Sequence, residues 1–148
     1  DGLPDLVFTN GDGFGPTLKP GPRPWHGVQW LENKGDGSFI YSRIGDLAGA
    51  YSPVVKDVDQ DGDKDILSVS GFNDWGNPKA ESLVWFRNDG DRGFTKVTLA
   101  HEPIQLLSID FADFDGDGTG EIISGCFPSY PPYERISRFT IWKETANR

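Results

Sequence analysis

The chain has 148 residues, of which 25% are charged and 36% hydrophobic, so it can form one soluble domain with a sizeable core. Its formal net charge of −9 argues against a nucleic-acid-binding surface, because phosphate contacts need clustered Lys and Arg. No apolar run approaches the roughly 18 residues that a membrane-spanning helix needs. Gly (19), Pro (11) and aromatic residues (13%) are abundant, which favours short strands joined by turns.

The middle of the chain shows the clearest order of strands. A strand is predicted over residues 51–56, followed by an acidic loop and a second strand over 66–70. A third strand over 82–87 is rich in β-branched and aromatic residues, and Asn-Asp-Gly-Asp then predicts a hairpin turn into a fourth strand over 94–99. Four short antiparallel strands in about 56 residues predict one blade of a β-propeller.

The sequence repeats itself at this spacing. Residues 57–71 recur as 113–125, displaced by 56, and residues 30–39 recur as 85–94, displaced by 55. A third tryptophan, Trp142, follows Trp85 by 57 residues. The first residues of the chain match the second half of the acidic loop, with Asp1 in the place of Asp61. We therefore expect an all-β fold, an incomplete propeller fragment in which residues 1–148 belong to one domain, with a partial blade over 1–50, a full blade over 51–101 and a partial blade over 102–148.

Acidic side chains alternate along the two complete loops, as calcium ligands would. Calcium takes six to eight oxygen ligands, and a short loop can supply them from alternate positions around a sharp glycine turn. The seventh position holds Asp in one loop and Thr in the other, so we expect its backbone carbonyl to bind. The predicted ligands are Asp57, Asp59, Asp61, Asp63 and Asp65 in one loop, Asp113, Asp115, Asp117, Thr119 and Glu121 in the other, and Asp1 and Asp5 in a partial third site.

Other interpretations of these loops are weaker. An EF-hand needs a bidentate acid at position 12 and flanking helices, but position 12 is Ser68 or Ser124 and the predicted flanks are strands. A solvated turn without metal would leave close like charges repelling one another. A pair of carboxylates for acid–base chemistry needs two contrasting environments, whereas this pattern simply repeats. Magnesium suits a loop with so many protein carboxylates less well than calcium does.

The pattern Asp-x-Asp-x-Asp-Gly-x-x-Asp, followed by a short apolar strand, resembles the FG-GAP or VCBS repeat of the integrin α-chain propeller and many bacterial extracellular proteins. The resemblance covers nearly the whole chain as about two and a half repeats. It implies calcium between the first and second strands of a blade, where loops 57–65 and 113–121 lie, and a secreted, cell-surface or periplasmic location. The chain departs from the pattern in lacking Gly-Ala-Pro after the second strand and in closing one loop with the longer Glu121.

The connections between second and third strands, at about 10–27, 71–81 and 127–136, are rich in aromatic residues and proline. In a propeller they share the face opposite the calcium loops, and flat rings there can stack on sugars. The alternative is that these aromatic side chains pack blade against blade. The candidate ligand-binding residues are Trp25, His26, Trp75, Asn77, Tyr130 and Tyr133.

The leading expectation is a non-catalytic extracellular module that binds a glycan or a protein. The alternatives are an accessory domain of a larger enzyme or redox protein, and a structural scaffold in a multiprotein assembly. Neither histidine has a catalytic or metal partner at a recognisable spacing, and the single Cys126 is expected to be a small core residue. Rings need at least about four blades, so the remaining blades would come from the same parent chain or from other copies.

Overall fold

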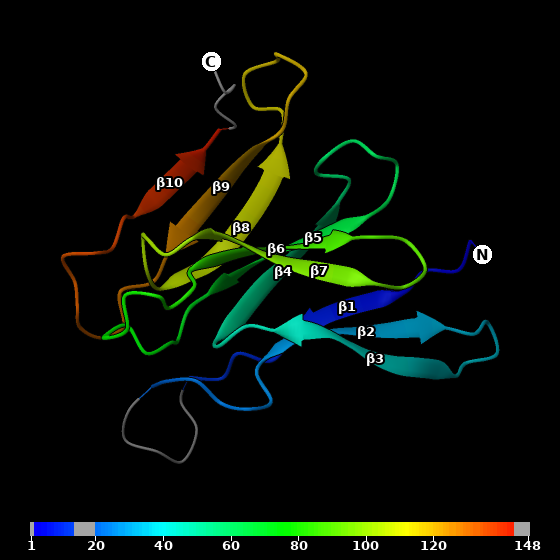
Figure 1. Cartoon of the computed structure of the whole chain (residues 1–148), viewed down its shortest axis with the longest axis horizontal. Helices are drawn as coiled ribbons and strands as arrows, with labels where there is room; N and C mark the ends of the chain where they lie inside the picture. The colour runs from blue at the N-terminus through cyan, green and yellow to red at the C-terminus, as the bar shows by residue number, and fades with distance from the viewer. Residues whose placement is uncertain (1, 14–19, 144–148) are drawn as a thin grey trace.

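The computed structural model describes residues 2–13 and 20–143, which form antiparallel sheets without any helix (Figure 1). Helices capable of crossing a membrane are accordingly absent from this described part. The first sheet contains β1 (Leu6–Thr9), β2 (Gly27–Asn33) and β3 (Phe39–Asp46). The second contains β4 (Ala50–Lys56), β5 (Asp65–Ser70), β6 (Leu83–Asn88) and β7 (Phe94–Ala100). The third contains β8 (Leu106–Ala112), β9 (Glu121–Cys126) and β10 (Phe139–Trp142).

The fold class expected from the sequence is confirmed. Each strand of the middle repeat begins and ends within one residue of its predicted bounds, and neighbours along the chain pair in order. The sheets contact one another mainly through β1 and β4 and through β8, which packs against both β4 and β5. In the described part of the chain the sheets fan out without closing into a ring (Figure 1).

The core lies between the sheets, and β5 is at its centre. All six residues of β5 are buried, because neighbouring sheets cover both of its faces. Side chains alternate between the faces of a strand. Ile66 therefore packs toward the first sheet, in a cluster with Val28 of that sheet and Phe86 of its own sheet. Leu67 packs toward the third sheet, in a cluster with Leu106 and Ile122.

The position of Trp142 differs from the sequence expectation. Trp30 pairs with Val7 and Trp85 pairs with Leu67, which are equivalent places in the first two sheets. Trp142 instead pairs with Ile122. Ile122 is equivalent to Ile66, which pairs with Phe86, so Trp142 takes the place of Phe86 and not of Trp85. The expectation that Trp142 repeats Trp85 is therefore wrong by one residue. Because a shift of one residue reverses the face of a strand, Trp142 packs toward the second sheet.

Candidate metal-binding loops and the opposite loop face

The two complete acidic loops have the same backbone design. Loop 57–65 joins β4 to β5, and loop 113–121 joins β8 to β9. Gly62 and Gly118, at position 6, have φ angles of +99° and +90°, a region that residues with a Cβ rarely adopt. In that conformation the N–H of Gly62 donates to Oδ2 of Asp57 at 3.1 Å, and the N–H of Gly118 donates to Oδ2 of Asp113 at 2.9 Å. The glycine turn therefore folds each loop around its first aspartate.

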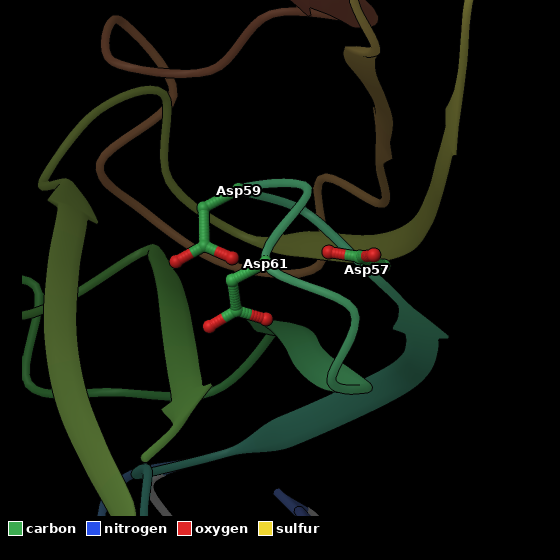
Figure 2. A group of neighbouring side chains, drawn as sticks. All are labelled: Asp57, Asp59 and Asp61. Atoms are coloured by element: carbon green, nitrogen blue, oxygen red, sulfur yellow. The ribbon is translucent and has the colours of Figure 1, made fainter. Parts of the chain in front are cut away.

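In loop 57–65 the first three acids converge (Figure 2). Asp57, Asp59 and Asp61 offer carboxylate oxygens that all lie within 4.8 Å of one another. Across the described chain, no Lys, Arg or His nitrogen lies within 4.0 Å of any acid in this loop. Burial and the nearby charges of Asp61 and Asp65 raise the pKa of Asp59. The loop is a concentration of negative charge without an internal counter-ion.

The acid at position 9 has a second role, which the sequence reasoning missed. Asp65 is fully buried, and its two oxygens accept the N–H groups of Val58 at 3.0 Å and Asn88 at 2.7 Å. In the first sheet Asp5 likewise accepts the N–H of Asn33 at 2.8 Å, along with the indole N–H of Trp30 at 3.0 Å. Asp65 thus ties its loop to the end of β6, and Asp5 ties the start of β1 to the end of β2. The recurrence of Asn at 33 and 88 was the available sequence signal.

Loop 113–121 gathers a different set of oxygens. Here Asp113, Asp115 and Glu121 lie within 4.8 Å of one another. Glu121 is only 3% exposed; its Oε2 accepts the N–H of Phe114 at 2.9 Å, and its Oε1 has no hydrogen-bond partner. The longer side chain at the closing position thus joins Asp113 and Asp115 and leaves one buried oxygen without a hydrogen-bond partner.

The side chain of a lysine contacts the acids of this second loop. The ammonium of Lys143 contacts Asp115, lies 2.7 Å from Oδ2 of Asp117 and lies 3.6 Å from Oε1 of Glu121. Hydrogen bonds to Asp115 and Asp117 raise the pKa of Lys143, and the bond from Lys143 lowers the pKa of Asp117. The two acidic loops therefore differ in electrostatics although their backbones match.

The donor sets fit a hard divalent cation. Every candidate ligand is an oxygen, and Oδ1 of Asp57, like Oε1 of Glu121, is buried without a hydrogen-bond partner. Asp63 and Thr119, at position 7, donate their N–H groups to the acid at position 5, both at 2.9 Å. The backbone carbonyl groups of these two residues remain the candidate metal ligands at position 7. The predicted ligand Asp1 lies outside the described residues.

The connections between second and third strands meet at the opposite end of the sheets. A cavity of about 640 Å³ is lined by residues 20–23, 73–76 and 130–132, one segment from each connection. The ring of Tyr130 stacks on Phe72 at 6.1 Å, and its hydroxyl both donates to the carbonyl and accepts from the N–H of Asn73. The cavity wall is therefore fixed by contacts between loops that are far apart in the sequence.

The six candidate ligand-binding residues separate into exposed and buried groups. Trp25 and Tyr133 are 50% and 51% exposed, Asn77 is exposed and Tyr130 is half-buried. Trp75 is 3% exposed and packs in a cluster with Ala80 and Ile104. It therefore follows the alternative expectation that the loop aromatic side chains pack inside the protein. Its ring is not a surface on which a sugar can stack.

His26 is 1% exposed and is held on both sides of its ring. Its Nδ1 accepts the N–H of Gly49 at 2.9 Å, so Nε2 carries the hydrogen that is donated to Asp12 at 3.0 Å. The indole N–H of Trp25 reaches the same Asp12 oxygen at 3.2 Å, and Arg43 binds the carbonyl groups of Trp25 and His26. The buried His26 thus helps to position the exposed Trp25, because both side chains bond the same oxygen of Asp12.

Comparison with known families gives one result. A family model described as FG-GAP-like repeat matches residues 1–68 and again residues 57–124. The two matches overlap at residues 57–68, which include the 57–65 loop, and together extend over most of the chain. No curated protein and no solved structure matches it.

Proposed function

This chain belongs to the FG-GAP-like repeat family, and from that premise we propose that it is a calcium-stabilised, non-catalytic binding module of an extracellular β-propeller. The family is a binding or structural module, is not typically catalytic, and often occurs in extracellular proteins. Function in such a fold resides in the loops that the sheets position rather than in the sheets themselves. Each end of the sheets therefore has a role of its own.

The observation that carries the calcium proposal is the charge in loop 57–65. Three carboxylates lie within 4.8 Å of one another, and none has a cationic side chain beside it in the described structure. A divalent cation would neutralise them and fix the glycine turn. Because the folded loop binds it and the unfolded chain does not, calcium stabilises the fold by mass action. The oxygen-only donor set is the type that calcium prefers.

The proposed ligand is a glycan or a protein bound at the opposite loop face. Trp25, Asn77 and Tyr133 present exposed side chains there, and Tyr130 forms part of the 640 Å³ cavity. Trp25 is held in place by Asp12 and Arg43, which reduces the entropy lost on binding. An exposed, held indole is suited to stacking on the face of a sugar.

Two strands at sheet edges, β1 in the first sheet and β10 in the third, favour a scaffold role. Leu6 and Phe8 on β1, and Phe139 and Ile141 on β10, are between 39% and 67% exposed. Apolar side chains beside unpaired strand edges usually contact further structure. We propose that additional blades cover these edges, from the same parent chain or from other copies.

Thermal unfolding tests the calcium proposal. At a calcium concentration 100 times its dissociation constant, one site stabilises the folded state by about 2.7 kcal/mol. We expect Tm to rise in calcium relative to chelator, to rise less in equimolar magnesium, and to lose most of the increase in Asp57→Asn/Asp61→Asn. Equal Tm values in calcium and chelator would contradict the proposal. A glycan array on the calcium-loaded chain tests the opposite face.

A further inference from the structure

We propose that Lys143 competes with the divalent cation for loop 113–121, so that this loop binds calcium more weakly than loop 57–65. The inference rests on the proposed calcium binding. Lys143 directly follows β10, and its ammonium contacts Asp115 and Asp117 and lies 3.6 Å from Oε1 of Glu121. A positively charged side chain of the protein already lies where a metal would bind.

The lysine and a cation would use the same oxygens. Asp113, Asp115 and Glu121 form the group whose oxygens lie within 4.8 Å, and two of these three also contact the ammonium of Lys143. Oε1 of Glu121 is buried and has no hydrogen-bond partner, so it is available to a metal. A divalent ion would repel an ammonium at such close range. Occupancy by calcium therefore requires Lys143 to leave.

Loop 57–65 provides the internal comparison. Phe86 pairs with Ile66 and Trp142 pairs with the equivalent Ile122, so the residues that follow them, Arg87 and Lys143, take equivalent places. The guanidinium of Arg87 turns to Asp89 in its own hairpin, with contacts of 2.9 and 2.8 Å. Loop 57–65 therefore lacks the counter-ion that loop 113–121 possesses.

The competition couples the third sheet to calcium. While the loop is free of metal, Lys143 ties the end of edge strand β10 to the β8–β9 loop through exposed ion pairs. When calcium binds, this tie is released and the ammonium returns to solvent. Loop 57–65 fills at a lower calcium concentration and loop 113–121 at a higher one, so the chain responds to calcium in two steps.

The test is a calcium titration of the whole chain followed by NMR, with the amides of Gly62 and Gly118 as reporters of the two loops. In the wild type we expect Gly118 to respond at a higher calcium concentration than Gly62. In Lys143→Gln the midpoint of Gly118 should fall about fivefold, the most that an exposed ion pair usually contributes, with Gly62 unchanged. Arg87→Gln is the matched control and should move neither midpoint.

The outcomes separate this inference from the proposed function. If Gly62 responds to calcium and the Gly118 midpoint is the same in Lys143→Gln as in the wild type, the competition is disproved and the calcium module stands. If neither amide responds in either protein, calcium binding itself is disproved and the competition with it. Dispersed amide signals from β8 and β9 in Lys143→Gln show that the variant remains folded.

Discussion

The N–H of Asn88 donates to Oδ1 of Asp65 at 2.7 Å, and this bond joins the end of β6 to the start of β5. The other oxygen of Asp65 accepts the N–H of Val58 at 3.0 Å, inside the acidic loop. One buried carboxylate thus fixes the loop against two strands before any metal is present. The acid that closes the motif is a structural element as well as a candidate ligand.

Replacing this acid should destabilise the chain even in chelator. Asp65→Ala leaves two backbone N–H groups without acceptors, and each buried unsatisfied group costs about 1–3 kcal/mol. We expect a loss of about 2–6 kcal/mol in urea unfolding without calcium. Asp63→Asn, at an exposed position in the same loop, is the control and should change stability by less than about 0.5 kcal/mol. Equal stability of the two variants would refute the structural role of Asp65.

Replacing Asp59 should have opposite effects with and without calcium. The pKa of Asp59 is raised above its ordinary 3.8 by burial and by neighbouring acids, so the folded state favours the protonated form. The resulting stability is present below pH 3.8 and is lost as the pH rises through the folded-state pKa. Ionised Asp59 therefore destabilises the metal-free chain at neutral pH.

We accordingly expect Asp59→Asn to raise Tm in chelator at pH 7 and to have little effect near pH 3.5, where more than half of the wild-type side chain is already protonated in the folded state. In calcium at pH 7 the same variant should lower Tm, because it removes a ligand. Differential scanning calorimetry under the three conditions checks both signs. A lower Tm for Asp59→Asn in chelator would show that repulsion in this loop is not relieved by the substitution.

The strands and the acidic loops could be predicted because their signals are local. Alternating acids, a glycine with positive φ and a short apolar strand all lie within a few residues, and loops 57–65 and 113–121 fold as this pattern requires. The register of Trp142 could not be predicted, because it depends on which residue of β9 it faces. Spacing along the chain does not reveal a shift of one residue in a connection.

The environments of the loop aromatics could not be predicted for a related reason. Trp75 is buried against Ile104, which lies in the connection that leads to the third sheet, and Tyr130 stacks on Phe72 of the previous repeat. Both contacts join segments of different repeats. The sequence shows that these loops are aromatic, but not which rings face solvent. The contacts of Lys143 with loop 113–121 could not be predicted for the same reason, because they join segments that are far apart in the sequence.

Substitutions of Trp25 and Trp75 should separate binding from folding. Trp75→Ala empties a buried site and should cost about 3–5 kcal/mol in urea unfolding. Trp25→Ala removes a half-exposed ring and should change stability by less than about 0.5 kcal/mol while weakening any glycan-array signal. Unchanged array binding by a folded Trp25→Ala protein would remove Trp25 from the proposed binding surface.

Arg92 joins the first two sheets. It lies in the hairpin between β6 and β7, donates to both oxygens of Glu32 on β2 at 2.9 Å, and places its guanidinium 6.0 Å from the ring centroid of Trp30. Lys34 donates to the same carboxylate at 3.0 Å. The hydrogen bond from Lys34, followed by the charge of Arg92, lowers the pKa of Glu32 below its ordinary 4.5. Because the folded-state pKa is lowered, the stability it provides is present above pH 4.5 and is lost as the pH falls through the folded-state value.

Removing either cation should therefore raise the pKa of Glu32 toward its ordinary value and move the midpoint of acid unfolding to higher pH. We expect a larger rise of the pKa in Lys34→Gln than in Arg92→Gln, because the hydrogen bond from Lys34 is the larger cause. Only Arg92→Gln should also loosen the contact between the two sheets, which faster amide exchange at Val28 and Ile66 would report, since both residues lie in the core between them. NMR titration of the Glu32 carboxyl and hydrogen exchange measure the two effects separately. Equal exchange rates in Arg92→Gln and the wild type would mean that the sheets are held by their apolar core alone.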